Sequence, residues 1–364
     1  MRPAVEPYEL AVIVDIPGTP GLTDAFVAGI RLGLDHCHEE GLCKRPVTLA
    51  VHEVPGQPWT SARPLERLVA EVAETDALGI AGPMVSDNAV AVAPILERCG
   101  LPTISICGSD GFSGPWLFRL SNGSLADEPY VMASWLAGAG HRRVGVFAEA
   151  PSRIADEYLE SFRRAAGQEG LTIRVVDGAP PGSDASVVAG AFARLRDAGV
   201  DAVAYLGFGS LFRHLRPALE GLAWNPPRVM TTAFVGATYT SRFAEMLDGW
   251  VGVDQYDERN LRLQQVLADL AEQGAVAVAN SSTAVGYDIG RVYGIALGRM
   301  TVANRRGLRD AIETIRRLPA ATGAPGTVIG FGRDQHAGFS GDYLLLRRAD
   351  AGTTHFVGVA PTGS

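Results

Sequence analysis

The chain has 364 residues, of which 47% are hydrophobic and 20% charged, with a formal net charge of −8. This length and composition suffice for two ordinary domains with sizeable cores, and they exclude a disordered or fibrous polymer. The acidic balance and scattered arginines argue against binding to nucleic acid or anionic lipid, because both require clustered cations. Lys44 is the only lysine, so lysine-dependent catalysis is not expected.

The compartment stays open at the level of sequence. No apolar stretch approaches the ~20 residues that a transmembrane helix requires. Residues Met1–Pro7 lead directly into the strand-like run Leu10–Ile16, and this start has neither the apolar core nor the cleavage site of an export signal. Two expectations follow: a periplasmic or cell-surface protein whose signal or lipid anchor is already removed, or a cytoplasmic protein.

Apolar strand-like runs alternate with segments of helical period in the first third of the chain. The expected order is strand Leu10–Ile16, helix Leu22–Glu40, strand Val47–Val54, helix Ser61–Glu74, strand Ala77–Ala81, helix Asn88–Arg98 and strand Thr103–Ile106. This alternation predicts a parallel sheet with helices on both faces. The loops Gly82–Ser86 and Cys107–Gly111 follow two of these strands, at the sheet edge where open α/β sheets bind ligands.

A second series of the same kind begins near Arg142. It comprises strand Arg143–Ala148, helix Ala155–Glu169, strand Thr172–Asp177, helix Ala185–Ala198, strand Ala202–Leu206, helix Leu211–Leu222 and strand Arg228–Thr231. The rest of the chain adds strand-like Trp250–Val253, helices Glu258–Gln273, Ser282–Arg299 and one near Leu308–Leu318, and β-like stretches Thr327–Phe331, Tyr343–Arg348 and Thr354–Val359.

The predicted fold class is α/β, with two Rossmann-like doubly wound lobes joined by a three-stranded hinge. The final segment is too short for a third domain, so we expect the chain to cross between the lobes three times, near Leu120–Asn122, Trp250–Asp254 and Ile329–Arg333. Lobe 1 is then expected to comprise residues 1–121 and 251–329. Lobe 2 is expected to comprise residues 122–250 and 330–364.

The sequence contains no complete nucleotide-binding or catalytic motif. The segments Gly207–Phe212 and Gly330–Arg333 begin like dinucleotide-binding loops but lack the third glycine at the required spacing. The chain has no phosphate-binding loop that ends in Gly-Lys-Ser/Thr, and no Gly-x-Ser-x-Gly nucleophile elbow. Ser109 follows a strand without a nearby histidine to activate it, so we expect it to donate to a ligand. The sequence predicts no enzyme and no cofactor.

The helix end Asp35–Glu39 carries residue types that bind metals. Adjacent residues on a helix diverge by ~100°, so these side chains cannot converge on one ion, and a solvated helix end is favoured over a metal site. The four cysteines, Cys37, Cys43, Cys99 and Cys107, allow three full pairings. A local Cys37–Cys43 disulfide and free buried thiols both stay open.

Several short segments, taken in their order and spacing, resemble one family. They are Gly29–Leu34, Ile80–Ser86, Gly100–Ser105, Phe118–Ser121, Gly170–Leu171 and Asp201–Tyr205. The chain resembles the branched-chain amino-acid-binding proteins of ABC transporters, the periplasmic-binding-protein type I group, from Ala11 to about Val357. The resemblance implies two lobes, a ligand cleft between them and closure by hinge motion.

The resemblance also implies binding positions. Ser86 falls where a serine hydroxyl and backbone amides hold a ligand carboxylate, and Cys107, Gly108 and Ser109 fall in the loop that completes that site. Ser86 can also cap the helix expected at Asn88, and the two roles are compatible. In the second lobe, Ile154 and Phe208 fall where relatives often place aromatic residues.

In relatives, an acidic residue binds the α-amino group of the ligand. The corresponding position is expected near Thr232–Phe234, where this sequence has no carboxylate. An unpaired buried ammonium costs several kcal/mol, so an α-amino acid ligand is disfavoured unless another acid substitutes. Aromatic residues that we expect to suit a less polar ligand include Trp59, Phe234 and Tyr256.

The first functional hypothesis is therefore a solute-binding protein of an ABC importer. It takes a small carboxylate-, carbonyl- or amide-bearing ligand, either amino-acid-like or aromatic and apolar, and its partners are the permease membrane subunits. A monomer is expected, with a dimer as the alternative. A cytoplasmic ligand sensor of the amide-sensor type is the second hypothesis, and an α/β enzyme is a remote third.

Overall fold

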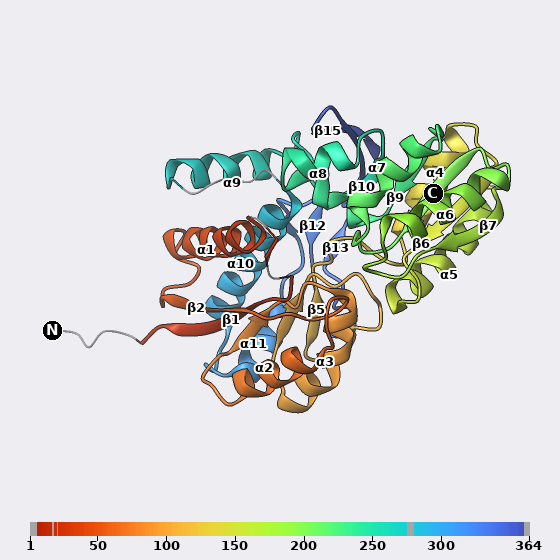
Figure 1. Cartoon of the computed structure of the whole chain (residues 1–364). Coiled ribbons are helices and arrows are strands. Elements are labelled where there is room, and N and C mark those ends of the chain that lie inside the picture. The colour runs from red at the N-terminus through yellow and green to blue at the C-terminus, as the bar shows by residue number, and fades with distance from the viewer. Residues whose placement is uncertain (1–5, 17, 20, 275–279, 360–364) are drawn as a thin grey trace. The chain divides into compact units, whose positions relative to one another are not determined.

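The computed structural model describes residues 6–16, 18–19, 21–274 and 280–359. It divides into two compact units: unit 1 comprises Met1–Asn122 and Tyr256–Tyr343, and unit 2 comprises Gly123–Gln255 and Leu344–Ser364. Each is built from a sheet and its own helices (Figure 1).

Unit 1 is built on a parallel five-stranded sheet with the order β2-β1-β3-β4-β5. Its strands are β1 (Tyr8–Val14), β2 (Val47–Glu53), β3 (Gly79–Ala81), β4 (Thr103–Ser105) and β5 (Leu117–Arg119). Residues Leu10–Val14 of β1 are all buried, which accounts for their continuous apolar run. In β2, at the sheet edge, partly buried and exposed residues largely alternate.

The described residues of unit 1 form six helices. They are α1 (Leu22–Glu39), α2 (Arg63–Ala73), α3 (Ser86–Cys99), α9 (Leu261–Glu272), α10 (Ser281–Arg299) and α11 (Arg305–Ile312). A small antiparallel sheet, β11 (Leu318–Pro319), β12 (Val328–Ile329) and β13 (Phe339–Ser340), completes the unit. One core cluster lies between the sheet and helices α2 and α3, with Leu65, Val69 and Leu96 as central members.

Helices α1 and α10 lie side by side and pack closely (Figure 1). Glycines on both helices allow this contact. On α1, a Cβ on Gly29 would lie 2.5 Å from the carbonyl oxygen of Thr283. On α10, a Cβ on Gly290 would lie 2.2 Å from the carbonyl oxygen of Ile30. Real Cβ atoms do not approach backbone so closely, so the two backbones can pack at this separation only because the side chains are absent.

Unit 2 is built on a seven-stranded sheet with the order β15-β14-β10-β9-β8-β6-β7. The strands are β6 (Arg143–Ala148), β7 (Thr172–Gly178), β8 (Ala202–Leu206), β9 (Arg228–Met230), β10 (Val251–Asp254), β14 (Leu345–Asp350) and β15 (Thr353–Val359). The five strands from β10 to β7 are parallel, and β14 and β15 add an antiparallel hairpin.

In the part of unit 2 that the structure describes, five helices and one 3₁₀ helix cover this sheet. They are α4 (Glu128–Gly138), α5 (Arg153–Gln168), α6 (Ala185–Asp197), α7 (Phe212–Gly221), the 3₁₀ helix η1 (Thr232–Thr238) and α8 (Ser241–Met246). The core includes Phe147 stacked on Tyr205 at a ring-centroid distance of 5.5 Å. Asp184 caps α6 by accepting from the amides of Ser186 and Val187.

The later lobe boundaries differ from the expected ones. Strand β10, expected in lobe 1, pairs with β9 and β14 in unit 2. The last boundary lies between Tyr343 and Leu344 and not near residue 330. The reason is local pairing: β12 pairs with β13, and the amide of Arg119 bonds to the carbonyl of His336, which retains residues 330–343 in unit 1.

Six elements of the described residues are not predicted by the sequence pattern: α4, β5, η1, α8, β11 and β13. Helix α4 has apolar residues around most of its circumference, so its sequence shows no helical period. Strand β5 has only three residues and lies next to the first expected crossing. Within the described ranges, no helix is both long and apolar enough to cross a membrane.

Candidate functional site

The loop after β3 is organised by a buried acid. Asp15, directly beyond β1, accepts hydrogen bonds from the amides of Met84 (2.6 Å) and Val85 (3.2 Å) and from Nδ2 of Asn88 (2.7 Å). Burial raises the pKa of Asp15 to about 6, although these hydrogen bonds act in the opposite direction. Gly82 has φ 106°, and a Cβ there would lie 2.2 Å from the carbonyl oxygen of Ile13, so the loop requires glycine.

Ser86 lies at the first position of α3 and contacts the loop after β4. Its hydroxyl oxygen accepts a hydrogen bond from the amide of Gly108 at 3.0 Å. In the same loop, Cys107 receives support from Ser105, whose hydroxyl accepts from the Cys107 amide at 3.0 Å. The hydroxyl of Ser109 accepts from the amide of Gly111 at 3.1 Å. The structure therefore brings Ser86 and the 107–109 loop together at the carboxyl ends of β3 and β4.

Trp59 lies on the loop after β2, and the residue is 52% exposed. Asn88 holds this loop to α3: its Oδ1 accepts from the amide of Gln57 at 2.9 Å, and its Nδ2 donates to the Gln57 carbonyl at 3.2 Å. The carboxamide of Asn88 also contacts Asp15, so one side chain connects the ends of β1, β2 and β3. These contacts place an exposed aromatic residue on the same sheet edge as Ser86.

In unit 2, the loop after β8 carries Phe208 and encloses a buried acid, Glu149. Glu149 accepts hydrogen bonds from the amides of Phe208 (2.7 Å) and Gly209 (3.1 Å), and from the hydroxyl of Tyr205. Burial raises the pKa of Glu149. The glycine-rich loop that resembles part of a nucleotide motif is thus occupied by a carboxylate of the chain itself.

A second buried acid, Glu128, lies against the loop after β9. It accepts from the amide of Thr232 (2.6 Å), the hydroxyl of Thr232 (2.9 Å), the hydroxyl of Tyr158 (2.9 Å) and the amide of Ser124 (2.7 Å). Burial raises its pKa to about 7. A carboxylate therefore lies beside Thr232 after all, contributed from residue 128, but both of its oxygens already accept hydrogen bonds from the protein.

The remaining expected site residues are placed differently. Phe234 is fully buried in the core of unit 2, where it packs beneath Gly252 of β10. Ile154 lies in the first turn of α5 and is 7% exposed. Tyr256, in unit 1, borders a cavity of about 220 Å³ beside α9, together with Leu263 and Leu267. The structure makes Phe234 a core residue of unit 2.

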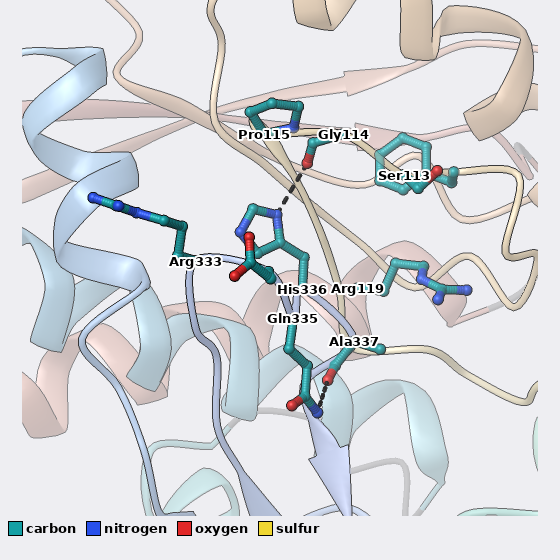
Figure 2. Close-up of a pocket in the computed structure, with 10 residues that line it drawn as sticks. Ser113, Gly114, Pro115, Arg119, Arg333, Gln335, His336 and Ala337 are labelled. Atoms are coloured by element: carbon teal, nitrogen blue, oxygen red, sulfur yellow. Dashed lines mark hydrogen bonds between the residues drawn. The ribbon is translucent and has the colours of Figure 1, made fainter.

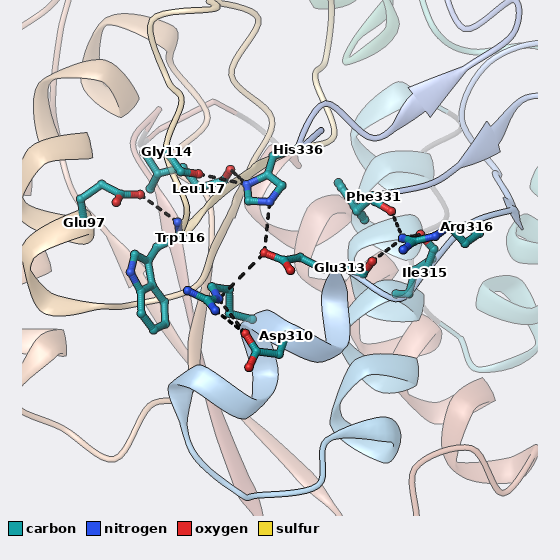
Figure 3. Close-up of polar contacts among 11 residues, drawn as sticks. Glu97, Gly114, Trp116, Leu117, Asp310, Glu313, Ile315, Arg316, Phe331 and His336 are labelled. Atoms are coloured by element: carbon teal, nitrogen blue, oxygen red, sulfur yellow. Dashed lines mark hydrogen bonds and ion pairs between the residues drawn. The ribbon is translucent and has the colours of Figure 1, made fainter. Parts of the chain in front are cut away.

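A separate cavity of about 440 Å³ in unit 1 is lined by Arg119, Arg333 and His336, among others (Figure 2). Arg119 pairs with Asp110 at 2.8 Å. His336 contacts the carbonyl oxygens of Gly114 and Leu117 at 3.0 Å each and lies 3.5 Å from Glu313 (Figure 3). In Figure 2 the two arginines point away from each other, so they do not converge on one anion.

The side chains of the helix end Asp35–Glu39 diverge. His36 lies 3.0 Å from the hydroxyl of Tyr287, His38 contacts the carbonyl of Cys43 at 2.9 Å, and the thiol of Cys37 donates to the carbonyl of Arg291. Over the described residues there is no group of three or more His, Cys, Asp or Glu side chains placed to hold a metal ion. All four cysteines are free thiols in the structure, and Cys99 is exposed.

The acids Asp15, Glu128 and Glu149 do not stand out as site residues in the sequence. A signal is nevertheless present for two of them: Asp15 lies within an apolar strand run, and Glu149 directly follows one. An acid at the carboxyl end of a buried strand is adjacent to the amides of the next loop, so it can satisfy donors that water cannot reach. Glu128 has no such signal, because its partner Thr232 lies 104 residues away.

The fold and these loops define an α/β protein of two doubly wound units with polar loops at the carboxyl ends of the parallel strands. A model of the periplasmic binding protein family matches residues 7–353. The chain therefore belongs to the periplasmic binding protein family, and it has the type I fold of that family.

Solved structures support the fold assignment at low sequence identity. A leucine-binding protein from Thermotoga maritima is 18% identical, with a TM-score of 0.78 over 97% of this chain and 98% of that chain. A solute-binding protein from R. palustris in complex with benzoate is 16% identical, with a TM-score of 0.78 over 98% and 96%. An ABC transporter substrate-binding protein from Sphaerobacter thermophilus is 24% identical, with a TM-score of 0.75 over 97% of each chain. A search of curated proteins finds no match.

Proposed function

We propose that this protein is the solute-binding component of an ABC importer that captures a small apolar or aromatic carboxylate. The observation that carries the proposal is the contact between Ser86 and the 107–109 loop in unit 1. Hydroxyls and amides at the start of a helix suit an anionic oxygen, because the helix N-terminus is electropositive and its first amides lack partners within the helix.

The proposed site uses Ser86, Cys107, Gly108 and Ser109 for the carboxylate and Phe208 for the apolar part of the ligand. A ligand that binds the closed form more tightly shifts the protein toward that form, because a ligand shifts a two-state equilibrium only by its differential affinity. The closed form is what the permease subunits recognise. In this proposal the protein works outside the cytoplasm and has no catalytic step.

The hydrogen bonds and the burial of Glu128 support a ligand that lacks an α-ammonium group. Both Glu128 oxygens accept hydrogen bonds from Thr232, Tyr158 and Ser124, and the carboxylate is fully buried. An ammonium ligand at Thr232 would have to displace these donors, since the described loop offers no second acid there. The benzoate complex of the R. palustris protein shows that a protein of this fold accepts an aromatic carboxylate.

A thermal-shift screen followed by calorimetry tests the proposal. Benzoate, phenylacetate, leucine and benzamide serve as probes, and a ligand at ~100 times its Kd raises the free energy of unfolding by about 2.7 kcal/mol. We expect shifts with the aromatic carboxylates, and we expect Ser109→Ala and Phe208→Ala to weaken binding while Ser340→Ala, on the exposed side of β13, leaves it unchanged. Shifts with α-amino acids alone would reject the ligand class, and unchanged affinity in both site variants would reject the site.

A further inference from the structure

We propose that Glu149 is a positioning residue that fixes Phe208 in the conformation that binds ligand. The inference rests on the proposed function, because it takes Phe208 as the apolar wall of the site. Glu149 itself is 1% exposed and is not offered as a ligand contact.

The contacts of Glu149 span the whole loop between β8 and α7. Its carboxylate accepts from the amides of Phe208 at 2.7 Å, Gly209 at 3.1 Å and Leu211 at 3.2 Å, and from the hydroxyl of Ser210 at 3.2 Å. The hydroxyl of Tyr205, on β8, donates to the same group. Every residue from Phe208 to Leu211 therefore bonds to one side chain.

The loop is shaped to receive this carboxylate. A Cβ on Gly207 would lie 2.6 Å from Cγ of Glu149, so glycine is needed where the side chain passes. Gly209 has φ 97°, a conformation that turns successive amides toward one point. Leu211 is the N-cap residue of α7, so the carboxylate accepts from an amide at the start of that helix, where its negative charge also favours the helix dipole.

Of the backbone contacts, the one to the Phe208 amide is the shortest, and it fixes the residue whose side chain we assign to the ligand. The hydroxyl of Thr231 donates to the carbonyl of Gly207 at 2.9 Å, so the residue before Phe208 is held as well. The loop around the Phe208 ring is thus held by internal hydrogen bonds before any ligand binds. Such preorganisation lowers the entropy cost of binding.

Replacing the carboxylate by a carboxamide tests this assignment with little change in volume. In Glu149→Gln an NH₂ group replaces one of the two acceptor oxygens. Both oxygen positions face backbone amide donors, so the NH₂ group meets donors in either orientation of the carboxamide. Buried donors left without an acceptor favour a rearranged loop. We expect the backbone amides of Phe208 and Gly209 to exchange with deuterium at least about tenfold faster in this variant, because the rearranged loop opens more readily.

Ligand affinity separates positioning from a merely structural role. With benzoate as the probe, we expect Glu149→Gln to weaken binding about tenfold, the scale of one charged hydrogen bond. In a Phe208→Ala background the same substitution should have almost no further effect, because Glu149 acts through Phe208. Ser210→Ala, which removes one donor and keeps the carboxylate, should shift affinity in the same direction by a smaller factor and serves if Glu149→Gln does not fold.

Asp288→Asn is the matched control. Asp288 is another buried acid, in unit 1, and it accepts from the amides of Ala321 (2.8 Å) and Thr322 (3.0 Å). We expect it to lower the melting temperature while its effect on benzoate affinity does not couple to Phe208.

The outcomes are distinguishable. Unchanged exchange at Phe208 in Glu149→Gln, or strictly additive effects of Glu149→Gln and Phe208→Ala, would overturn the inference. If benzoate does not bind the unmodified protein, the proposed ligand class fails, while deuterium exchange still decides whether Glu149 fixes the loop. If Phe208→Ala leaves affinity unchanged, the proposed site fails and the assignment of Glu149 to ligand binding fails with it.

Discussion

The amide of Gly108 donates a hydrogen bond to the hydroxyl oxygen of Ser86 at 3.0 Å, which connects the loop after β4 to the first turn of α3. Because that oxygen accepts from Gly108, the Ser86 proton is directed toward a different acceptor, and a ligand carboxylate is the acceptor we propose. Ser86→Ala should therefore weaken carboxylate binding by about tenfold, measured by calorimetry with benzoate.

A control variant and a second measurement accompany the Ser86 prediction. Ser340→Ala, exposed on β13, should leave the affinity unchanged. Deuterium exchange at the Gly108 amide should accelerate in Ser86→Ala, because its acceptor is gone. Full affinity together with faster exchange would mean that Ser86 supports the loop without contacting the ligand.

Asp15 should make the stability of the protein fall as pH rises. Its ordinary pKa is 3.8 and burial raises the folded-state value to about 6, so the folded protein binds the proton more tightly than the unfolded chain. The stability contribution is fully present below pH ~4 and is lost as pH rises through ~6, by up to about 3 kcal/mol at 1.36 kcal/mol per pKa unit.

Urea unfolding of the unmodified protein and Asp15→Asn, between pH 4 and 7, measures this contribution. The difference in free energy of unfolding, unmodified minus variant, should decrease across that range, since Asn does not titrate. Other buried acids, such as Glu128 and Asp288, titrate equally in both proteins and cancel. A difference that is independent of pH would contradict the prediction.

Asn88→Ala should release the loop that carries Trp59. The substitution removes the donor to Asp15 and both contacts to Gln57, and it leaves a buried carboxylate short of one partner. We expect a loss of about 1–3 kcal/mol in the free energy of unfolding and faster proteolysis between Pro55 and Ser61. Gln168→Ala, which removes an exposed carboxamide from α5, is the control and should stay within about 0.5 kcal/mol of the unmodified protein.

Gly290→Ala should destabilise the protein by several kcal/mol, because the new Cβ would lie 2.2 Å from the carbonyl oxygen of Ile30 and would force α1 and α10 apart. Gly167→Ala, within α5, would place its new Cβ where no neighbouring atom lies within 4 Å, and it should raise the free energy of unfolding by about 0.5–1 kcal/mol. Thermal unfolding of the two variants separates the steric effect from helix propensity. Equal effects of one sign would reject the packing argument.

Thiol reactivity should distinguish Cys99 from the other cysteines. Cys99 is exposed, whereas Cys37, Cys43 and Cys107 are buried, and burial raises the pKa of Cys37 to about 11 and also raises that of Cys43. Titration with a thiol reagent should label one group quickly in the folded protein and four after unfolding. Fewer than four reactive groups in the unfolded protein, without reductant, would show that a disulfide forms.

Local patterns are sufficient for most of the architecture. The apolar runs at Leu10–Val14 and Ala202–Leu206 are continuous because those strands are covered on both faces, and the helices between them show one apolar face, so alternation alone predicts parallel sheets. The loops with Ser86 and Ser109 can be located for the same reason: residues that follow parallel strands gather at one edge of a sheet.

Elements without a local period cannot be placed in this way. Helix α4 is apolar on nearly all sides, and residues Val328–Ile329 resemble a crossing strand in sequence, although their pairing with β13 retains them in unit 1. Whether such a run crosses or folds back depends on which strand it pairs with, and the hydrogen bond from Arg119 to His336 joins segments more than 200 residues apart.

The sequence by itself determined the α/β class, two series of strands and helices, and the polar loops of the family, because periodicity and turn residues are local properties. Only the tertiary structure decided the roles of Asp15, Glu128 and Glu149. In the sequence each is one of 40 acidic residues that contribute to a net charge of −8. In the fold each lies where distant backbone amides converge away from water, and that convergence turns an ordinary surface charge into a buried group that shapes a loop.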